Sequence, residues 1–350
     1  MITREFNIQS MVRDNIITLK PYASARDEFA GQSEHMVFMD ANENPFNSIV
    51  NRYPDPKQTE LRVRISQLKN VSPSQIILGN GSDELLDLLF RAFCNPGKDH
   101  VITLPPTYGM YEVLAQINDI EVVSIELDSD FEPQVSKILE NQNESSKLLF
   151  LCSPNNPTAN NFNTNTIETL ILNFNGIVVI DEAYIDFSKR ESWLNRLDEF
   201  PNLIVLQTFS KAYGMAGIRL GMCFASETVI SILNSIKLPY NINVLTQMKA
   251  LDRLSKTEII QTEIKRIIEQ REWLKIELDA IPWITIVYPS DTNFLLIKVD
   301  NANKRYTELI SKGIVVRNRT SQPGCDNCLR ITVGTAIENL KLIKTLKTIS

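Results

Sequence analysis

The sequence contains two histidines and five cysteines among 350 residues. Five cysteines in so long a chain do not form a disulfide framework, and we see no group of residues at metal-ligand spacing. Cys325 and Cys328 form a lone C-x-x-C pair without a second pair, which we interpret as coincidence rather than as a metal or redox site. A reduced, cytoplasmic protein is therefore the default expectation.

Long apolar runs and an excess of positive charge are also missing. No stretch approaches the roughly 20 apolar residues that a membrane-spanning helix needs, and residues 1–10 lack the apolar region of a signal peptide. The net charge of −6 argues against general binding to nucleic acid or anionic membranes. A hydrophobic content of 43% and a charged content of 22% are typical of a soluble globular protein.

The chain from about residue 60 to residue 240 alternates strand-like and helix-like segments. Strand-like runs occupy 75–78, 100–104, 148–152, 177–180 and 203–206, and apolar spacing predicts helices over 83–93 and 108–116. Continuous apolar runs suit strands that are covered on both faces. We therefore predict an α/β fold with a mostly parallel sheet, in a large domain spanning 41–245.

The pattern changes after residue 245. One long charged helix is predicted over 257–278, followed by strand-like segments at 283–287, 293–299, 314–316 and 329–333 and a helical segment near 305–311. These segments predict a smaller α+β domain over 246–350. Residues 1–40 are predicted to form an N-terminal arm that belongs partly to the small domain and packs against it or against a partner chain.

The most informative motif begins at Ser210-Lys211 and continues to Gly-Ile-Arg219-Leu-Gly, just beyond the strand-like run 203–206. It closely resembles the cofactor-lysine segment of pyridoxal-phosphate (PLP) enzymes of fold type I. In these enzymes a lysine amine forms a Schiff base with the cofactor aldehyde, and the protein tunes the cofactor ring. The resemblance implies that Lys211 carries PLP and that Ser210 and Arg219 hold its phosphate.

A glycine-rich turn, Gly79-Asn-Gly-Ser-Asp-Glu84, follows a predicted strand and opens a helix. Backbone N–H groups at a helix N-terminus can hold a phosphate dianion, and glycines allow close approach. Taken alone, the turn is best explained as a well-capped helix start. The turn also resembles the phosphate cup of histidinol-phosphate aminotransferases, which implies that the backbone N–H groups of Ser82, Asp83 and Glu84 hold the PLP phosphate.

Asp181 follows the strand-like run 177–180, at the carboxyl end where open α/β sheets bind ligands. Taken alone, it could cap the next turn. The resemblance implies that Asp181 pairs with the protonated pyridine nitrogen of PLP and that Tyr184 hydrogen-bonds the ring oxygen. Glu182, between them, is expected to play a structural role.

Two more segments follow predicted strands. Asn156, before Pro157, matches the asparagine that donates to the PLP ring oxygen, although Ala159 stands where the family commonly has glycine. Tyr108 lies at a strand-to-helix junction, and the resemblance implies that it stacks on the PLP ring. Taken alone, these residues are explained by a Pro-Asn turn and by ordinary packing.

Two arginines lie in or beside apolar C-terminal runs. Arg330 stands within 329–333 and Arg317 directly after 314–316. Burying an arginine is unfavourable unless an anion partners it, and its planar fork suits carboxylate or phosphate. In the aminotransferase superfamily the arginine that matches Arg330 binds the substrate α-carboxylate. In the histidinol-phosphate enzymes Arg317 and a tyrosine like Tyr22 join it at the substrate anion; from its sequence alone, Arg317 could equally reach solvent.

Three N-terminal segments narrow the resemblance: Leu19-Lys-Pro-Tyr22, Asn42-Glu-Asn-Pro45 and Arg52-Tyr-Pro-Asp55. Together the motifs run in order over almost the whole chain. That ordered set resembles class I/II PLP aminotransferases of fold type I, and within them the histidinol-phosphate aminotransferases. The resemblance implies that Asn42 contacts the substrate and that Tyr53 reaches the PLP phosphate of the other subunit, so that the active site needs a homodimer.

The implied activity transfers the amino group between L-histidinol phosphate and 2-oxoglutarate, which yields imidazole acetol phosphate and glutamate in histidine biosynthesis. Lys211, once freed by the donor amine, would move a proton between the substrate carbon and the cofactor.

Alternatives of the same fold are an aromatic amino-acid aminotransferase and a threonine-phosphate decarboxylase, because the motifs that hold PLP do not separate them. A PLP-binding regulator is disfavoured, since no basic DNA-binding head precedes Tyr22. A dinucleotide-dependent hydride-transfer enzyme fits worse still, because Glu84 stands where the glycine fingerprint needs its last glycine.

Overall fold

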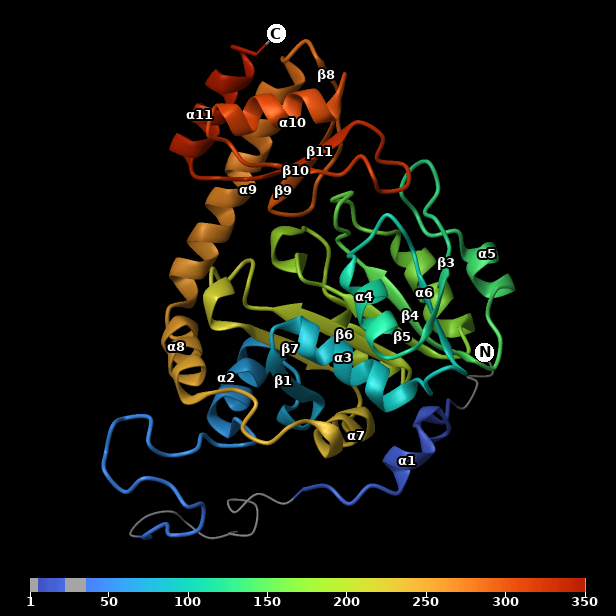
Figure 1. Ribbon diagram of the computed structural model, residues 1–350, viewed down its shortest axis with the longest axis vertical. Coiled ribbons are helices and arrows are strands. Elements are labelled where there is room, and N and C mark those ends of the chain that lie inside the picture. The colour runs from blue at the N-terminus through green and yellow to red at the C-terminus, as the bar shows by residue number, and fades with distance from the viewer. Residues whose placement is uncertain (1–5, 23–35, 350) are drawn as a thin grey trace.

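The computed structural model describes residues 6–22 and 36–349 (Figure 1). Parts of the predicted N-terminal arm, residues 1–5 and 23–35, lie outside the described residues, as does residue 350. Within the described ranges, no helix combines the length and the apolar character that crossing a membrane requires.

Within the described residues, a seven-stranded sheet has the order β1-β7-β6-β5-β4-β2-β3. Its strands are β1 (Ile76–Asn80), β2 (His100–Thr103), β3 (Glu121–Ser124), β4 (Ser146–Cys152), β5 (Ile177–Asp181), β6 (Leu203–Thr208) and β7 (Leu220–Phe224). β7 runs antiparallel to both of its neighbours, and the other pairs are parallel. The prediction of a mostly parallel α/β sheet is confirmed.

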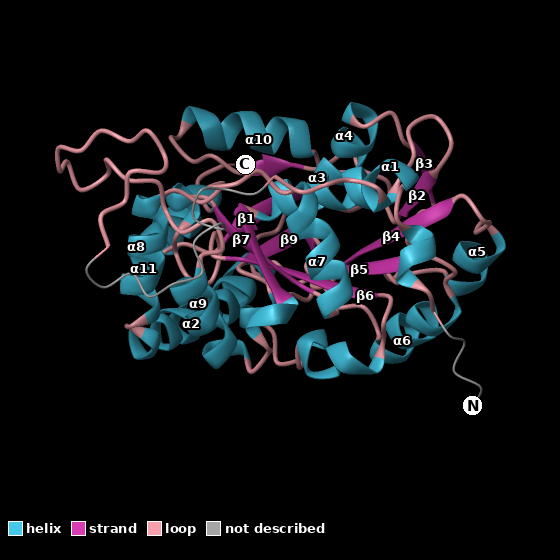
Figure 2. Ribbon diagram, turned by 90° about the horizontal axis from the view of Figure 1, so that it is seen from below, coloured by secondary structure: helices cyan, strands magenta, loops and turns pink. Residues whose placement is uncertain are grey.

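Helices cover both faces of this sheet (Figures 1 and 2). One core cluster joins Ile77 and Phe150 to α3, α4 and α7, whereas the other joins Leu78 and Leu151 to α2 and α6. The helices are α2 (Thr59–Lys69), α3 (Ser82–Phe93), α4 (Met110–Ile117), α6 (Thr164–Asn173) and α7 (Glu227–Ile236). Because successive side chains of a strand point to opposite faces, strands buried on both faces must be apolar at nearly every position.

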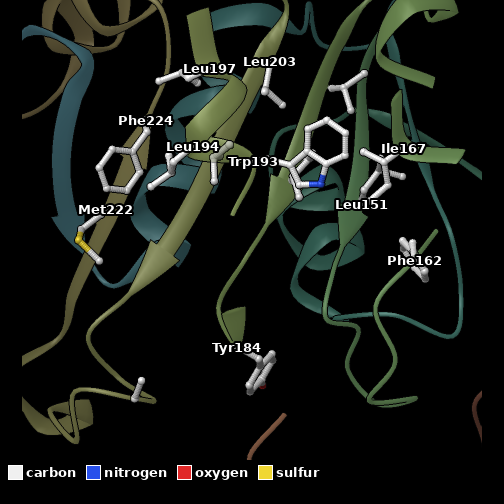
Figure 3. Close-up of a cluster of buried hydrophobic side chains, with 14 of the residues drawn as sticks. Leu151, Phe162, Ile167, Tyr184, Trp193, Leu194, Leu197, Leu203, Met222 and Phe224 are labelled. Atoms are coloured by element: carbon white, nitrogen blue, oxygen red, sulfur yellow. The ribbon is translucent and has the colours of Figure 1, made fainter. Parts of the chain in front are cut away.

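Figure 3 shows part of the cluster beneath the sheet. Trp193, Leu194 and Leu197 of the 3-10 helix η4 (Trp193–Glu199) belong to the same core as Leu203 of β6. Tyr184 is a member of this cluster and lies at its loop end (Figure 3). Each large apolar side chain buried here contributes roughly 1.5–3 kcal/mol, so the cluster holds the strand ends rigidly in place.

A second, antiparallel sheet within the described residues has the order β10-β11-β9-β8. Its strands are β8 (Ile284–Val287), β9 (Phe294–Val299), β10 (Arg317–Asn318) and β11 (Cys328–Thr332), and its helices are α9 (Thr257–Asp279), α10 (Ala302–Ser311) and α11 (Ala336–Leu346). α9 extends from α8 (Val244–Leu254) to this sheet (Figure 1). The smaller α+β part is confirmed, while the boundaries at 1–40, 41–245 and 246–350 stay predictions.

The strand predicted at 314–316 is wrong, because β10 begins at Arg317. The preceding residues close the end of α10 instead. The backbone N–H of Gly313 donates to Ile310 O (2.9 Å) and that of Ile314 to Leu309 O (2.9 Å). Gly313 has φ 76°, a left-handed conformation typical of a residue that ends a helix. Ile314 and Val316 therefore pack on the small-domain core without joining the ladder, and Val315 is exposed.

Candidate active site

The carboxyl ends of β4, β5 and β6 meet the N-terminus of α3 around a cavity of about 150 Å³. Most of the predicted cofactor-binding residues line it: Ser82, Asp83, Tyr108, Asn156, Asp181, Tyr184, Ser210, Lys211 and Arg219. These residues span 138 positions of the sequence but belong to turns that follow neighbouring strands. Parallel strands bring their carboxyl ends to one edge, which explains the convergence.

Asp181 is the last residue of β5 and is buried. Its Oδ2 accepts a hydrogen bond from the Tyr111 hydroxyl (2.8 Å), and its Oδ1 accepts one from the backbone N–H of Ala183 (3.1 Å). Burial raises the pKa of Asp181 to about 6, although both hydrogen bonds oppose the shift. Among the described residues Asp181 forms no ion pair, so a cation brought to this point would stabilise its ionised form.

Lys211 stands in the turn after β6, where Gly214 N–H donates to Lys211 O (3.0 Å). Its Nζ lies 5.6 Å from the centre of the Tyr184 ring. Burial, followed by the positive charge of Arg330, lowers the pKa of Lys211. A lowered pKa increases the share of neutral amine, the form that attacks a carbonyl carbon or accepts a proton.

The opposite end of the cavity presents Ser82 and Asp83 in the first turn of α3. Backbone N–H groups of a first turn have no acceptor within their own helix. Arg219 points at this turn, with Nη2 3.3 Å from Asp83 Oδ2 and Nη1 3.4 Å from Ser210 Oγ. The helix terminus, the hydroxyl and the guanidinium together form a site suited to an anion.

Two glycines allow this close packing. A Cβ at Gly81, which has φ 75°, would lie 2.4 Å from Nη2 of Arg219. A Cβ at Gly221 would lie 2.4 Å from the backbone N of Ser82. Side chains at either position would therefore displace the turn whose N–H groups face the cavity.

The Glu84 and Glu182 carboxylates have structural partners. Glu84 Oε2 accepts hydrogen bonds from the backbone N–H of Asn80 and from Asn241 Nδ2 (2.9 Å), and Glu84 does not line the cavity. Glu182 accepts from the backbone N–H of Trp193 (2.7 Å) and from Gln207 Nε2 (2.8 Å). These contacts agree with the structural role expected for Glu182.

Two tyrosines form further parts of the wall. The Tyr108 hydroxyl donates to Asp83 Oδ1 (3.0 Å). Tyr184 packs edge-on against Phe294 of β9 with ring centres 5.2 Å apart. Burial raises the pKa of both tyrosines, so each hydroxyl stays protonated at neutral pH and can donate a hydrogen bond.

Asn156 joins the cavity to the small sheet. Its Oδ1 accepts a hydrogen bond from Nη1 of Arg330, a residue of β11, and the Arg330 guanidinium lies 5.1 Å from the centre of the Phe294 ring. The Nε of Arg330 is buried without a hydrogen-bond partner among the described residues. A guanidinium with an unsatisfied donor at the rim of a cavity can bind an anion there.

Ala159, which stands where the resemblance leads us to expect glycine, has a backbone conformation that favours glycine. Its φ is 70°, in the left-handed region. The turn is nevertheless formed, because the Ala159 N–H donates to Asn155 O (2.9 Å) and its carbonyl accepts from Asp291 N–H (2.8 Å). The substitution therefore costs roughly 1–2 kcal/mol of backbone strain without moving Asn156 from the cavity.

Six predicted residues do not line the cavity, namely Glu84 and Arg330, described above, and Tyr22, Asn42, Tyr53 and Arg317. Tyr22 is 73% exposed and borders a hollow beside α7. Asn42 and Tyr53 border another hollow, where Tyr53 stacks on Tyr240 with ring centres 4.5 Å apart. Arg317 is exposed and lies opposite Arg330 in the strand register. Their assigned roles stay predictions.

Sequence reasoning missed several residues of the site. Tyr111 lies within the helix predicted over 108–116 and was given no role, yet its buried hydroxyl donates a hydrogen bond to Asp181. Cys152 and Thr208 line the cavity at the ends of β4 and β6.

Residues 33–346 match the family model described as aminotransferase class I and II. The chain is 59% identical over 343 residues to the histidinol-phosphate aminotransferase of Flavobacterium johnsoniae, with 98% of each chain covered. Its structure is similar to that of histidinol-phosphate aminotransferase from Clostridium acetobutylicum, with TM-score 0.78, 25% identity and 85% of this chain and 90% of that chain covered.

A further structural neighbour, of the same fold, is histidinol-phosphate aminotransferase from Sinorhizobium meliloti in complex with pyridoxal-5'-phosphate. The TM-score is 0.79 at 21% identity, with 86% of this chain and 85% of that chain covered. The family model spans nearly the whole sequence, and more than half of the aligned residues are identical to those of the F. johnsoniae relative. The chain belongs to the aminotransferase class I and II family.

Proposed function

We propose that this protein is a PLP-dependent aminotransferase that acts on L-histidinol phosphate and 2-oxoglutarate and forms imidazole acetol phosphate and glutamate in histidine biosynthesis. The observation that carries the proposal is the cavity itself. It holds a desolvated lysine, a buried carboxylate and a helix N-terminus, and it is joined through Asn156 to the arginines of the small sheet. The similarity to F. johnsoniae histidinol-phosphate aminotransferase supports the choice of substrate.

The residues present fit PLP, which carries an aldehyde, a pyridine ring and a phosphate. Lys211 suits the aldehyde and the buried Asp181 suits a protonated ring nitrogen. The turn kept open by Gly81 and Gly221, with Arg219, suits the phosphate. When bound, PLP supplies an electron-poor ring that accepts the electrons left behind as a proton leaves the substrate carbon.

The chain's own residues then have distinct tasks. Lys211 holds the cofactor at rest and afterwards moves a proton to and from the substrate carbon, which its lowered pKa permits. Asp181 keeps the ring nitrogen protonated. Tyr184 and Asn156 would hold the ring through its oxygen, and Tyr108 would contact the ring.

The substrate anion is assigned to the small-sheet side of the cavity. Arg330 binds it there, with Arg317, and with Tyr22 and Asn42 from the N-terminal segments. The partly unsatisfied guanidinium of Arg330 supports this assignment. The same position accepts a carboxylate of glutamate or 2-oxoglutarate in the second half of the reaction.

The test mixes the PLP-loaded enzyme with histidinol phosphate in the absence of a keto acid and follows the visible absorption of the lysine-bound cofactor. We expect rapid loss of this absorption and its recovery when 2-oxoglutarate is added, because each half of a transamination stops without its second substrate. Phenylalanine and threonine phosphate serve as comparison substrates. Absorption lost with phenylalanine alone would assign the enzyme to aromatic transamination, and carbon dioxide released from threonine phosphate would assign it to decarboxylation.

We also propose that the enzyme is a homodimer in which Tyr53 contacts the PLP phosphate of the partner subunit. The segment 36–58 extends away from the large domain (Figure 1). It exposes large apolar side chains, namely Met36, Val37, Met39, Phe46, Ile49, Val50 and Tyr53. An apolar patch of this kind marks an interaction surface.

Mixing two defective variants tests the shared site. Lys211→Ala subunits and Tyr53→Ala subunits are expected to recover activity when they are unfolded and refolded together, because one site of the mixed dimer then contains both native residues. Two variants refolded separately and then combined serve as the control. Activity no higher than the sum of the separate variants would place Tyr53 within its own subunit's site.

A cytoplasmic location is part of the same proposal. All five cysteines are free, which suits a reducing compartment. Cell fractionation would test this location.

A further inference from the structure

β10 and β11 place three arginines on one face of the small sheet. Arg317 is the register partner of Arg330, and Asn318 that of Leu329. The backbone N–H of Arg319 donates to Cys328 O (2.9 Å), which continues the pairing by one residue. Because alternate residues of a strand share a face and directly paired residues lie side by side, Arg317, Arg319 and Arg330 share one face, here named the arginine face.

The arginine face is turned toward the large domain. Cys328 and Phe294 lie on the same face of the small sheet as Arg330, and both belong to the core cluster of the large sheet. Leu329 and Ile331 lie on the opposite face and belong to the core of the small domain. Tyr184, which lines the cavity, packs on Phe294. In Figure 1 the small sheet lies above the large sheet.

The positive charges of the arginine face lack a counter-ion within residues 6–22 and 36–349, where none of the three guanidinium groups has a carboxylate within ion-pair distance. The Nε atoms of Arg319 and Arg330 are both buried without a hydrogen-bond partner there. Burial, and then the charges of Arg330 and Arg317, lower the pKa of Arg319 to about 10. Three neighbouring cations, of which Arg319 and Arg330 are partly desolvated, need an anion to offset their repulsion.

We propose that Arg319 is a third anion-binding residue of the substrate site and that the three arginines together select a phosphate dianion over a single carboxylate. This inference rests on the proposed function. A carboxylate has one charge and two oxygens, which the fork of one arginine can bind in a bidentate manner. A phosphate ester carries a charge of about −1.5 to −2 and three acceptor oxygens, so it can engage further guanidinium groups.

The test compares Arg319→Gln and Arg319→Lys with the native enzyme and with Arg266→Gln, a matched change on the exposed side of α9. For Arg319→Gln we expect the KM for histidinol phosphate to rise about 10- to 100-fold, because a hydrogen bond to a charged group is lost. The KM for 2-oxoglutarate should change by no more than about 2-fold. Arg319→Lys keeps the positive charge but loses the planar guanidinium. Its KM for histidinol phosphate should therefore lie between the values of the native enzyme and of Arg319→Gln.

A binding measurement separates this inference from the proposed function. Calorimetric titration of the PLP-loaded enzymes with inorganic phosphate should show weaker phosphate binding by Arg319→Gln than by the native enzyme. Arg266→Gln should bind phosphate as tightly as the native enzyme does. Equal phosphate affinity and equal KM values in the Arg319 variants and the native enzyme would overturn the inference, as would an equal rise in KM for both substrates. If the native enzyme leaves histidinol phosphate unchanged, the proposed function fails, and the phosphate titration alone decides the role of Arg319.

Discussion

Replacement of Lys211 by alanine is expected to abolish repeated turnover while leaving the fold intact. The ε-amine is the group in the cavity that can both hold the cofactor aldehyde and transfer the substrate proton. Loss of a positioned acid–base group alone lowers a rate by about 10²- to 10⁴-fold, and loss of the cofactor attachment adds to that effect. The measurement is steady-state turnover with histidinol phosphate and 2-oxoglutarate, together with the visible spectrum of the PLP-loaded protein.

The fold should tolerate this change because burial already disfavours the charged amine. The Lys211 Nζ lies over the Tyr184 ring, 5.6 Å from the ring centre, and no ion pair of the described residues includes it. Lys249→Ala, on the exposed side of α8, is the matched control and should keep native turnover. A Lys211→Ala enzyme with full turnover would contradict the assignment of the cavity as the active site.

Replacement of Asp181 by asparagine is expected to lower kcat/KM by about 10²- to 10³-fold, the usual effect of removing one electrostatic partner from a preorganised site. Asparagine has nearly the same shape and its oxygen can still accept a hydrogen bond from Tyr111, so the loss is mainly that of the negative charge. Without that charge, the ring nitrogen of PLP loses its proton more easily and the ring accepts electrons less well. A rate within about 2-fold of native would show that Asp181 does not act on the ring.

The same variant predicts a pH-dependent difference in the stability of the cofactor-free protein. The pKa of Asp181 is about 6 in the folded state, against an ordinary value of 3.8. The folded state therefore binds the Asp181 proton more tightly than the unfolded state does. The stability that this difference provides is fully present below pH 3.8 and is lost as the pH rises through 6. At pH 8 we expect cofactor-free Asp181→Asn to have a free energy of unfolding higher than native by up to about 3 kcal/mol, with the gap closing toward pH 4.

Denaturant unfolding at several pH values measures this difference. Asp279→Asn, at the exposed end of α9, controls for the loss of one negative charge from the protein as a whole. A stability gap between Asp181→Asn and the native protein that stays constant with pH would contradict the raised pKa.

The sequence by itself determined the elements whose signal is local. The runs 148–152, 177–180 and 203–206 are apolar at every position or nearly so, which only a strand covered on both faces requires, and all three are strands of the large sheet. Lys211 and Asp181 could be placed at the cavity from sequence because Asp181 ends one such strand and Lys211 stands three residues beyond the end of another. Strand ends, turn glycines and helix starts are encoded by neighbouring residues, so the order of the motifs was sufficient to locate the cofactor cavity.

The tertiary structure decided the contacts between distant segments. Arg330 reaches Asn156 across 174 positions, and Tyr111 reaches Asp181 across 70. The end of α10 uses the backbone of Gly313 and Ile314, which moves β10 to Arg317 and brings Arg319 beside Cys328. These outcomes depend on how two separately folded sheets pack and on which backbone groups a neighbouring helix already uses. Local periodicity contains no information on sheet packing or on the hydrogen bonds of a neighbouring helix. The cofactor cavity was therefore predictable, whereas the position of Arg319 beside Arg330 was not.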